Sequence, residues 1–351
     1  MSPSSEAEDA FRALLGERIV IKDGPYGTAI QNLGLNEADY GGELDLGHDQ
    51  KGNNDLLNLT RPDAIAGIAR AYAEAGADLL ATNTFNANAI SQADYGAEAL
   101  VADINRAGAR IVRAEADAAC HRDGRRRFVA GALGPTNKTL SLSPRVEDPG
   151  FREVDFDGVK AVYRQQIDAL LEGGVDFILI ETVFDTLNAK AAAMAAMEAE
   201  EECGQRVPLM LSMTLTDLAG RNLSGQTVEA FWVSVMHTRP LTIGLNCSFG
   251  ATELRPHVQT LAAIADAPIL IYPNAGLPNA FGGYDEAPDT TAALVRAWAE
   301  AGLVNAVGGC CGTTPAHIAR MVEVVRPLPP RRLPEPSPAL RLAGLEAAVF
   351  A

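Results

Sequence analysis

Three observations predict a single (β/α)8 barrel, an α/β fold of the TIM-barrel class, followed by a proline-rich linker. From residue 60 onward, helical patterns alternate strictly with short apolar runs, which is typical of parallel strands joined by right-handed crossovers. Counting the first apolar run, the chain holds eight strand and helix units, the number that closes a barrel. Unusual polar residues also follow the strands at the ends where barrels carry their active sites.

The predicted strands are short apolar runs bounded by turn residues: 18–23, 78–82, 127–133, 176–180, 207–214, 241–246, 268–272 and 303–307. The predicted helices follow the 3.6-residue period: 60–75, 96–119, 157–172, 185–202, 227–237, 253–265, 289–301 and 315–325. Thr60 with Asp63 opens the first helix, and Thr313 or Thr314 caps the last one, with Pro315 at its first position.

An open doubly wound sheet is the alternative fold. Its first turn should carry a glycine fingerprint for a dinucleotide, but the first turn here, Asp23-Gly24-Pro25-Tyr26-Gly27-Thr28, lacks it. Pro25 removes an N–H group where a phosphate would need one. The closed barrel is therefore preferred.

The barrel is predicted to cover residues 18–326, with different segments on either side. Residues 1–17 are interpreted as an N-terminal leader with one amphipathic turn around Phe11, Leu14 and Leu15. Residues 327–351 are interpreted as a linker and the start of a connection to a following domain. Six prolines fall within 327–338, and such a segment behaves as a stiff spacer.

Composition excludes several classes of partner. Lysine and arginine total 29 against 45 acidic residues, a net charge of −16, so nucleic acid is not expected as a partner. The sequence lacks an apolar run near the roughly 18 residues that cross a bilayer, so we expect no membrane association and a cytoplasmic location. Five cysteines in a chain of 351 residues do not form a disulfide scaffold, and clustered ones favour metal binding or catalysis.

Three of these cysteines follow two strands whose ends lie on one rim with only the seventh strand between them: Cys247 comes after the sixth strand, and Cys310 and Cys311 come after the eighth. Zinc held by three protein ligands keeps its fourth position open, as catalytic zinc does. Asn274, after the seventh strand, could fill that position when substrate is absent. The alternatives are a vicinal disulfide, small core residues, or a phosphate site in the glycine-rich turn, although phosphate binding would leave the thiols without a role.

Other polar residues are predicted at the same rim: Asp23, Asn83, Thr84 and Glu181. Zinc with three thiolates is a poor Lewis acid but can hold a fourth thiol as an electron-rich thiolate, which favours alkyl transfer to sulfur. Two carboxylates, Asp23 and Glu181, suit the ammonium group of an amino-acid thiol, although rim carboxylates also cap helices or pair with lysine. Backbone N–H groups around Gly24 and Thr28 could bind the substrate carboxylate.

Six segments together resemble one known family. They are 23–28, 51–55 (Lys-Gly-Asn-Asn-Asp), 181–190 (Glu-Thr-Val-Phe-Asp-Thr-Leu-Asn-Ala-Lys), 244–247, 273–278 and 308–312 (Gly-Gly-Cys-Cys-Gly). This chain resembles the homocysteine-binding, zinc-containing domain of cobalamin-dependent methionine synthase over about residues 15–326. Pro25 and Tyr26 depart from the alanine and methionine expected there, which affects only the shape of that loop.

The resemblance implies a function for these sites. Zn²⁺ would lie on Cys247, Cys310 and Cys311 with the thiolate of L-homocysteine as fourth ligand, and Asp23 and Glu181 would lie near the substrate amino group. The methyl group would come from methylcobalamin on a separate domain to give methionine, with cobalamin-binding and folate-binding domains of the same or a partner chain as partners.

Two other functions stay open at this point. A homocysteine methyltransferase that uses betaine or S-methylmethionine would share the cysteines, although the 181–190 segment and the proline linker argue against it. A non-catalytic barrel with a structural zinc site is the second alternative. In that case the metal site would be coordinatively closed, and homocysteine would not affect zinc binding.

Overall fold

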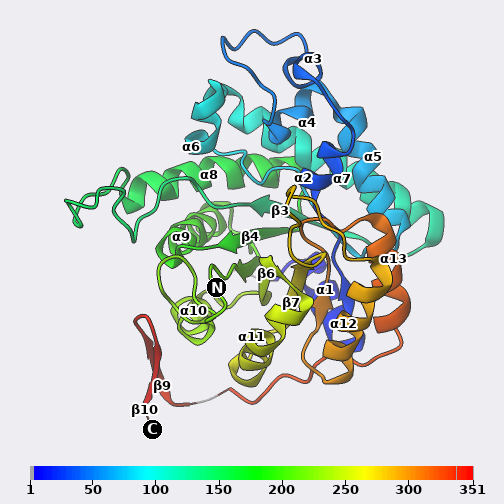
Figure 1. Ribbon diagram of the computed structural model, residues 1–351, viewed down its shortest axis with the longest axis vertical. Helices are drawn as coiled ribbons and strands as arrows, with labels where there is room; N and C mark the ends of the chain where they lie inside the picture. The colour runs from blue at the N-terminus through cyan, green and yellow to red at the C-terminus, as the bar shows by residue number, and fades with distance from the viewer. Residues whose placement is uncertain (1–3, 337, 351) are drawn as a thin grey trace.

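The computed structural model describes residues 4–336 and 338–350, and it confirms the predicted (β/α)8 barrel (Figure 1). The eight parallel strands are β1 (Val20–Ile21), β2 (Leu79–Ala81), β3 (Phe128–Leu133), β4 (Phe177–Val183), β5 (Leu209–Met213), β6 (Thr242–Gly250), β7 (Ile269–Asn274) and β8 (Ala306–Val307). Each pairs with its neighbours in chain order, and β8 returns to β1. A bridge between Lys22 and Leu79 joins β1 to β2 and closes the ring.

Helices follow the strands and surround them (Figure 1). The eight barrel helices are α5 (Pro62–Glu74), α7 (Val101–Asp123), α8 (Phe156–Gly173), α9 (Thr186–Cys203), α10 (Val228–Val235), α11 (Ala251–Ile264), α12 (Pro288–Glu300) and α13 (Pro315–Val325). Shorter helices lie in the first two loops: α2 (Tyr26–Gln31), α3 (Glu37–Gly41), α4 (Leu57–Thr60) and α6 (Ala89–Gln92). All predicted elements are present, with ends shifted by a few residues.

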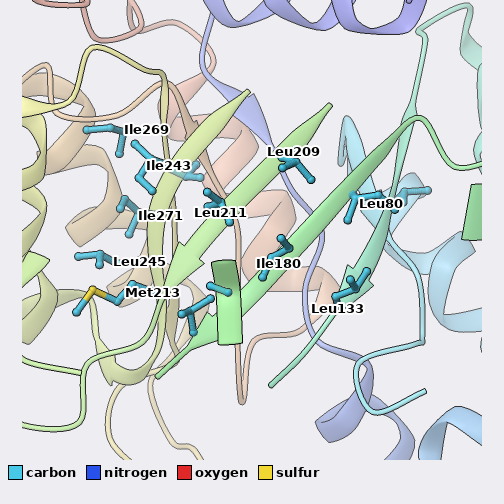
Figure 2. Close-up of a cluster of buried hydrophobic side chains, with 14 of the residues drawn as sticks. Leu80, Leu133, Ile180, Leu209, Leu211, Met213, Ile243, Leu245, Ile269 and Ile271 are labelled. Carbon is cyan, nitrogen blue, oxygen red and sulfur yellow. The ribbon is translucent and has the colours of Figure 1, made fainter. Parts of the chain in front are cut away.

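The strands are buried on both faces, so two apolar layers form. Side chains that point outward pack beneath the helices, and Figure 2 labels ten of them, including Leu80, Ile180 and Ile243. Alternate side chains point inward and fill the barrel, among them Leu79, Leu179 and Met210. This alternation decides which residues at the strand ends reach the barrel axis.

The segment predicted as a leader is instead a helix that closes the bottom of the barrel, where the strands begin. Helix α1 (Glu6–Glu17) starts at Ser5, whose side chain accepts a hydrogen bond from the Glu8 N–H. Phe11 is fully buried inside the barrel base, with its ring centroid 4.9 Å from those of both Phe128 and Phe177. The sequence pattern indicated only one amphipathic turn here, because the partners of this apolar face lie far along the chain.

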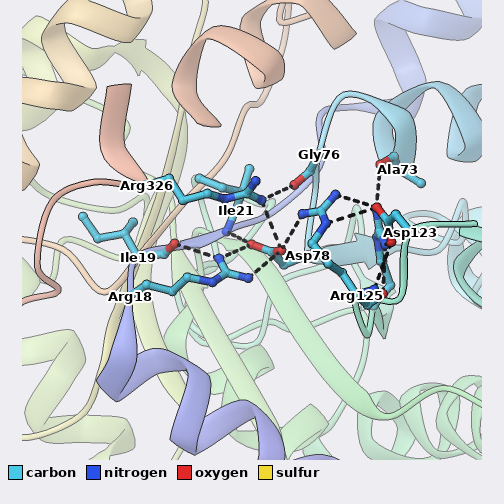
Figure 3. Close-up of polar contacts among 10 residues, drawn as sticks. Arg18, Ile19, Ile21, Ala73, Gly76, Asp78, Asp123, Arg125 and Arg326 are labelled. Carbon is cyan, nitrogen blue, oxygen red and sulfur yellow. Dashed lines mark hydrogen bonds and ion pairs between the residues drawn. The ribbon is translucent and has the colours of Figure 1, made fainter. Parts of the chain in front are cut away.

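A buried carboxylate near the same end binds several arginines (Figure 3). Asp78 is fully buried, and it accepts hydrogen bonds from Arg18 at 2.7 and 2.9 Å and from the Ile21 N–H at 3.0 Å. Arg125 and Arg326 lie 3.7 and 3.6 Å from the same carboxylate. A buried charge is tolerated when it is paired and hydrogen-bonded in this way.

The proline-rich segment also differs from the prediction, because its first part belongs to the barrel. Arg331 is 5% exposed, and its guanidinium donates hydrogen bonds to the backbone oxygens of Ala262, Ala265 and Ala267 at the end of α11. These orphan carbonyls explain why residues 327–331 dock rather than act as a spacer. Beyond them, β9 (Leu340–Ala343) and β10 (Ala347–Phe350) form a hairpin near α10 (Figure 1).

The described residues include no helix that is both long enough and apolar enough to span a lipid bilayer.

Candidate metal centre and active site

The floor of the candidate site is the last layer of side chains inside the barrel. Because side chains alternate along a strand, the residue two positions after an inward-facing core residue also faces the axis. These residues, taken in order from β1 to β8, are Lys22, Ala81, Ala132, Glu181, Ser212, Asn246, Tyr272 and Gly308. Small residues on β2, β3 and β8 leave room above the apolar core, and polar residues occupy the other five positions.

Cys247 reaches the site through an irregularity in β6. The pairing of β6 with β7 shifts between Asn246 and Gly250, which marks a bulge. Cys247 and Ser248 adopt left-handed backbone conformations with φ of 62° and 60°, which are costly for residues with a side chain. Asn246 points inward, so a regular strand would turn Cys247 outward. The bulge therefore directs this thiol toward the site.

Cys310 and Cys311 lie in the turn between β8 and α13. The Cys310 N–H donates to the Pro273 oxygen at 2.8 Å, which ties the turn to the end of β7. A side chain at Gly309 would fall 2.1 Å from the Thr313 hydroxyl, so only glycine fits there. Thr314 caps α13 together with His317, as one of the two predicted caps. The turn is thus fixed on both sides.

The three sulfur atoms meet at the top of the barrel, where the strands end. All three lie within 4.8 Å of one another, and Cys247 Sγ is 3.9 Å from Cys311 Sγ. Hydrogen bonds from Cys247 and Cys310 stabilise a thiolate on Cys311 and lower its pKa to about 3. Hydrogen bonds with its two neighbours and burial raise the pKa of Cys310. The cluster can therefore hold one negative charge before any cation binds.

Asn274 is tied to the cysteine turn through the backbone of the residue that follows it. It ends β7, and the N–H of the next residue, Ala275, donates to the Cys311 oxygen at 2.9 Å. Asn274 is 2% exposed, and within residues 4–336 and 338–350 its Oδ1 atom has no hydrogen-bond partner. Buried amide oxygens are rarely left unpaired, so this unpaired oxygen, on a strand end bonded to the cysteine turn, is compatible with the predicted role of Asn274 as a metal ligand.

Charged and aromatic side chains of the floor lie below the sulfurs. The Tyr272 hydroxyl donates to Glu181 Oε2 at 3.0 Å, and the Lys22 ammonium lies 4.7 Å from the centre of the Tyr272 ring. Lys22 also donates to Asp23 Oδ1 at 2.8 Å, while the Ala81 N–H donates to Asp23 Oδ2 at 2.8 Å. Burial raises the pKa of Glu181, and the positive charge of Lys22 partly offsets this effect.

The predicted site residues mostly surround one cavity of about 470 Å³. Its wall includes Gly24, Thr28, Asn83, Glu181 and the three cysteines. Asp23 lies fully buried behind this wall, with both carboxylate oxygens engaged. The Thr84 hydroxyl donates to the Ala132 oxygen at 2.8 Å, so in this structure it supports the loop after β2. Contact of these two residues with substrate stays a prediction.

The cavity wall carries one more buried carboxylate, beyond Asp23 and Glu181, that sequence reasoning missed. Asp55 is 3% exposed, and its Oδ1 accepts a hydrogen bond from the Asn86 N–H at 3.0 Å. Burial raises the pKa of Asp55 to about 7. This side chain is therefore protonated over part of the neutral pH range.

The chain matches a known protein family along the whole barrel. A family model described as homocysteine S-methyltransferase matches residues 20–325, from β1 to the end of α13. The chain belongs to the homocysteine S-methyltransferase family. It is therefore a methyltransferase whose family acts on homocysteine, as the sequence motifs predicted. The cysteine cluster and its cavity lie within the matched residues.

Solved structures of a homocysteine methyltransferase share the fold of this family member. The metallated form of MmuM from Escherichia coli has a TM-score of 0.70 and 23% sequence identity, over 89% of this chain and 98% of that one. The oxidised form of MmuM gives 0.69 and 21%, over 87% of this chain and 95% of that one. At these identities the likeness shows a common barrel.

Sequence reasoning also missed Lys22 and Tyr272. Lys22 ends the apolar run Ile19-Val20-Ile21, and a charged side chain at the carboxyl end of a predicted barrel strand is the signal that could have indicated it. Tyr272 carries a similar signal, because its hydroxyl needs a partner inside an apolar strand. The candidate site therefore includes a lysine and a tyrosine in the cavity wall that the motifs alone do not indicate.

Proposed function

We propose that this chain is the homocysteine-activating domain of a cobalamin-dependent methionine synthase system. The observation that carries the proposal is the convergence of three cysteine sulfurs within 4.8 Å of one another, beside a cavity that Glu181 also lines. Thiolate ligands are typical of zinc, and a three-cysteine set leaves a position for a substrate sulfur.

The residues present fit a zinc ion. Cys247, Cys310 and Cys311 would hold it, and the unpaired Oδ1 of Asn274 would be the fourth ligand when substrate is absent. Zinc bound in this way would supply the positive charge that keeps a substrate thiol deprotonated at neutral pH. The glycine-framed turn and the bulge in β6 hold the sulfurs in place, which favours a site formed before the metal arrives.

The chain would bind the rest of homocysteine through the cavity wall. Glu181 lines the cavity, so its carboxylate would accept a hydrogen bond from the substrate ammonium group. Asp23, which is paired with Lys22 behind the cavity wall, would add a second negative charge near this group. Backbone N–H groups of the loop from Gly24 to Thr28 would contact the substrate carboxylate. The substrate sulfur would then supply the electron pair of the new S–CH3 bond, and the donor would keep the pair of the bond that breaks.

The methyl donor is proposed to be methylcobalamin carried by a separate domain. The 181–190 segment supports this choice, because it resembles methionine synthase, and the proline-rich composition after the barrel argues against the alternatives. Betaine and S-methylmethionine are the competing donors. A direct assay of methionine formation from homocysteine with each donor distinguishes them, and a rate with methylcobalamin below the rates with both others would contradict the proposal.

The first test is calorimetric titration of the zinc-loaded protein with L-homocysteine in buffers of different ionisation enthalpy. We expect binding with about one proton released, because the thiol must ionise to become a ligand. The Cys310→Ala variant should neither bind nor release the proton. Tight zinc binding without any homocysteine binding would contradict the proposal and leave a structural zinc site.

A further inference from the structure

We propose that Lys22 is a specificity-determining residue that binds the α-carboxylate of the amino-acid thiol, so that the barrel floor holds both charges of a zwitterion. This inference rests on the proposed function, and it concerns a residue that lies outside the motifs shared with methionine synthase. Three features of the floor carry it: the position of Lys22, its unused hydrogen-bonding capacity and its relation to Glu181.

Lys22 points into the barrel because of the residues around it. It lies two positions after the inward-facing Val20, and on the neighbouring strand β8 the equivalent position is Gly308. A side chain at Gly308 would fall 2.8 Å from Lys22 Cβ, so only glycine leaves room for the lysine to cross toward β7. Lys22 is 3% exposed, and it contributes to the wall of the cavity with the three thiols.

The ammonium group of Lys22 keeps a donor for a ligand. An ammonium has three N–H donors, and Asp23 accepts one at 2.8 Å. The ring of Tyr272, 4.7 Å away, stabilises the cation through its face. Burial alone would lower the pKa of Lys22, but the charges of Asp23 and Glu181 outweigh it, so the side chain stays positive. One donor remains for a group in the cavity.

The charges of the floor match those of an amino acid. Tyr272 separates the two ionic groups, with Lys22 over its ring and Glu181 Oε2 3.0 Å from its hydroxyl. Among the described residues of the cavity wall, Lys22 is the only lysine or arginine, and it is therefore the only permanent cation near the sulfurs. A substrate held by its sulfur would place its ammonium group toward Glu181 and its carboxylate toward Lys22, where each charge meets its opposite.

The competing explanation is that Lys22 only neutralises Asp23. The two explanations differ in which ligands a substitution affects. A residue that serves Asp23 alone influences every ligand equally, whereas a carboxylate-binding residue influences only ligands that carry a carboxylate. Removing the carboxylate from the ligand and the ammonium from the protein therefore forms a double-mutant cycle.

The experiment compares two thiols by calorimetry on zinc-loaded wild type and Lys22→Met. L-homocysteine carries both charges, and 3-aminopropane-1-thiol is the same molecule without the carboxylate. We expect the wild type to bind homocysteine roughly 10- to 100-fold more tightly than the aminothiol, which is the affinity that a charged hydrogen bond would add. In Lys22→Met this preference should fall below about 3-fold. Glu181→Gln is the matched control, since it should weaken both thiols and leave their ratio unchanged.

Two further measurements separate loss of carboxylate binding from misfolding and from changes in thiol ionisation. Lys22→Met leaves Asp23 buried without its cation, so the double variant Lys22→Met, Asp23→Asn is measured beside it to separate loss of recognition from misfolding. L-methionine against 3-(methylthio)propan-1-amine repeats the comparison with a thioether, which removes any dependence on thiol ionisation. The preference for methionine should fall in the same two variants.

The outcomes separate the two proposals. If homocysteine binds the wild type and Lys22→Met weakens both ligands of a pair by the same factor, the carboxylate assignment is wrong and the proposed function stands. If homocysteine does not bind the zinc-loaded wild type at all, the proposed function fails, and the Lys22 assignment fails with it.

Discussion

At the bottom of the barrel the buried charged side chains are paired, whereas at the top several residues have strained backbone conformations or unpaired polar atoms. Asp78 binds the Arg18 side chain and a backbone N–H, and the Phe11 ring packs between two others. At the top, by contrast, Thr182, Cys247 and Ser248 account for three of the four non-glycine residues with positive φ in the described chain. The comparison indicates that a well-packed base supports strain where ligands bind.

The largest expected effect is on zinc affinity, and it should come from removing a thiol at the top of the barrel. We expect Cys310→Ala to lose zinc binding by at least about 100-fold, because a three-cysteine site loses a ligand. The free energy of unfolding of the zinc-free protein should change by less than about 1 kcal/mol, since Cys310 is neither a large nor a fully apolar core residue. Competition with a chromophoric chelator measures the affinity.

Cys203→Ala is the matched control for this prediction, because Cys203 is exposed at the end of α9. It should leave zinc binding unchanged. Equal zinc affinity in the wild type and Cys310→Ala would place the metal elsewhere and remove the contrast between the two ends.

The next largest expected effect is on the free energy of unfolding, and it should come from a substitution at the bottom of the barrel. Phe11→Ala removes a fully buried ring between Phe128 and Phe177, and we expect a loss of about 3–5 kcal/mol in the free energy of unfolding. Zinc affinity of the folded protein should stay within about 2-fold, because the apolar layers separate this ring from the thiols. Denaturant unfolding and chelator competition measure the two quantities. Glu17→Ala, an exposed change on the same helix, should have little effect on either.

A third prediction concerns pH and the buried Asp55. Its pKa is raised to about 7, so between roughly pH 4 and pH 7 the folded chain keeps a proton that the unfolded chain has lost. Asp55 therefore lowers stability as pH rises through this window, by about 1.4 kcal/mol per pH unit. Asp55→Asn should remove this slope, so its advantage over the wild type should grow from pH 5 to pH 7 in urea unfolding. A constant difference would show that Asp55 is ionised throughout.

The smallest expected effect belongs to Asn274. Replacing it with alanine removes a buried oxygen without a described partner but leaves a small cavity, so stability should change by less than about 1 kcal/mol. Zinc affinity without homocysteine should fall several-fold, and zinc affinity with saturating homocysteine should not change. Asn274→Asp keeps an oxygen ligand and should retain the affinity. Equal affinities in all three proteins would exclude Asn274 as a ligand.

The sequence predicted the barrel and the cysteine cluster for the same reason. Strict alternation of helices and strands determines that all strand ends meet at one rim, so Cys247, Cys310 and Cys311 converge without knowledge of any side-chain conformation. The family comparison confirms the barrel and the homocysteine methyltransferase assignment.

Other features depend on contacts that local patterns do not reveal. Parallel strands are apolar on both faces, so the pattern around Lys22 does not show which face it occupies. Cys247 and Ser248 adopt positive φ values in the bulge, but neither is a glycine. Glycine is the usual sequence signal of a positive φ, so the bulge could not be predicted from the sequence. The docking of α1 depends on Phe128 and Phe177, and that of Arg331 depends on the end of α11, so local patterns did not reveal that either segment packs on the barrel.

The position of α1 has a consequence for how the protein is made. This helix is synthesised before the barrel strands, yet its aromatic partners belong to β3 and β4, which are synthesised more than 100 residues later. Until then its apolar face has nothing to cover and remains open to chaperones or to other nascent chains. Helix α1 is thus translated ahead of the strands that cover it, and its docking has to wait until β3 and β4 have been made.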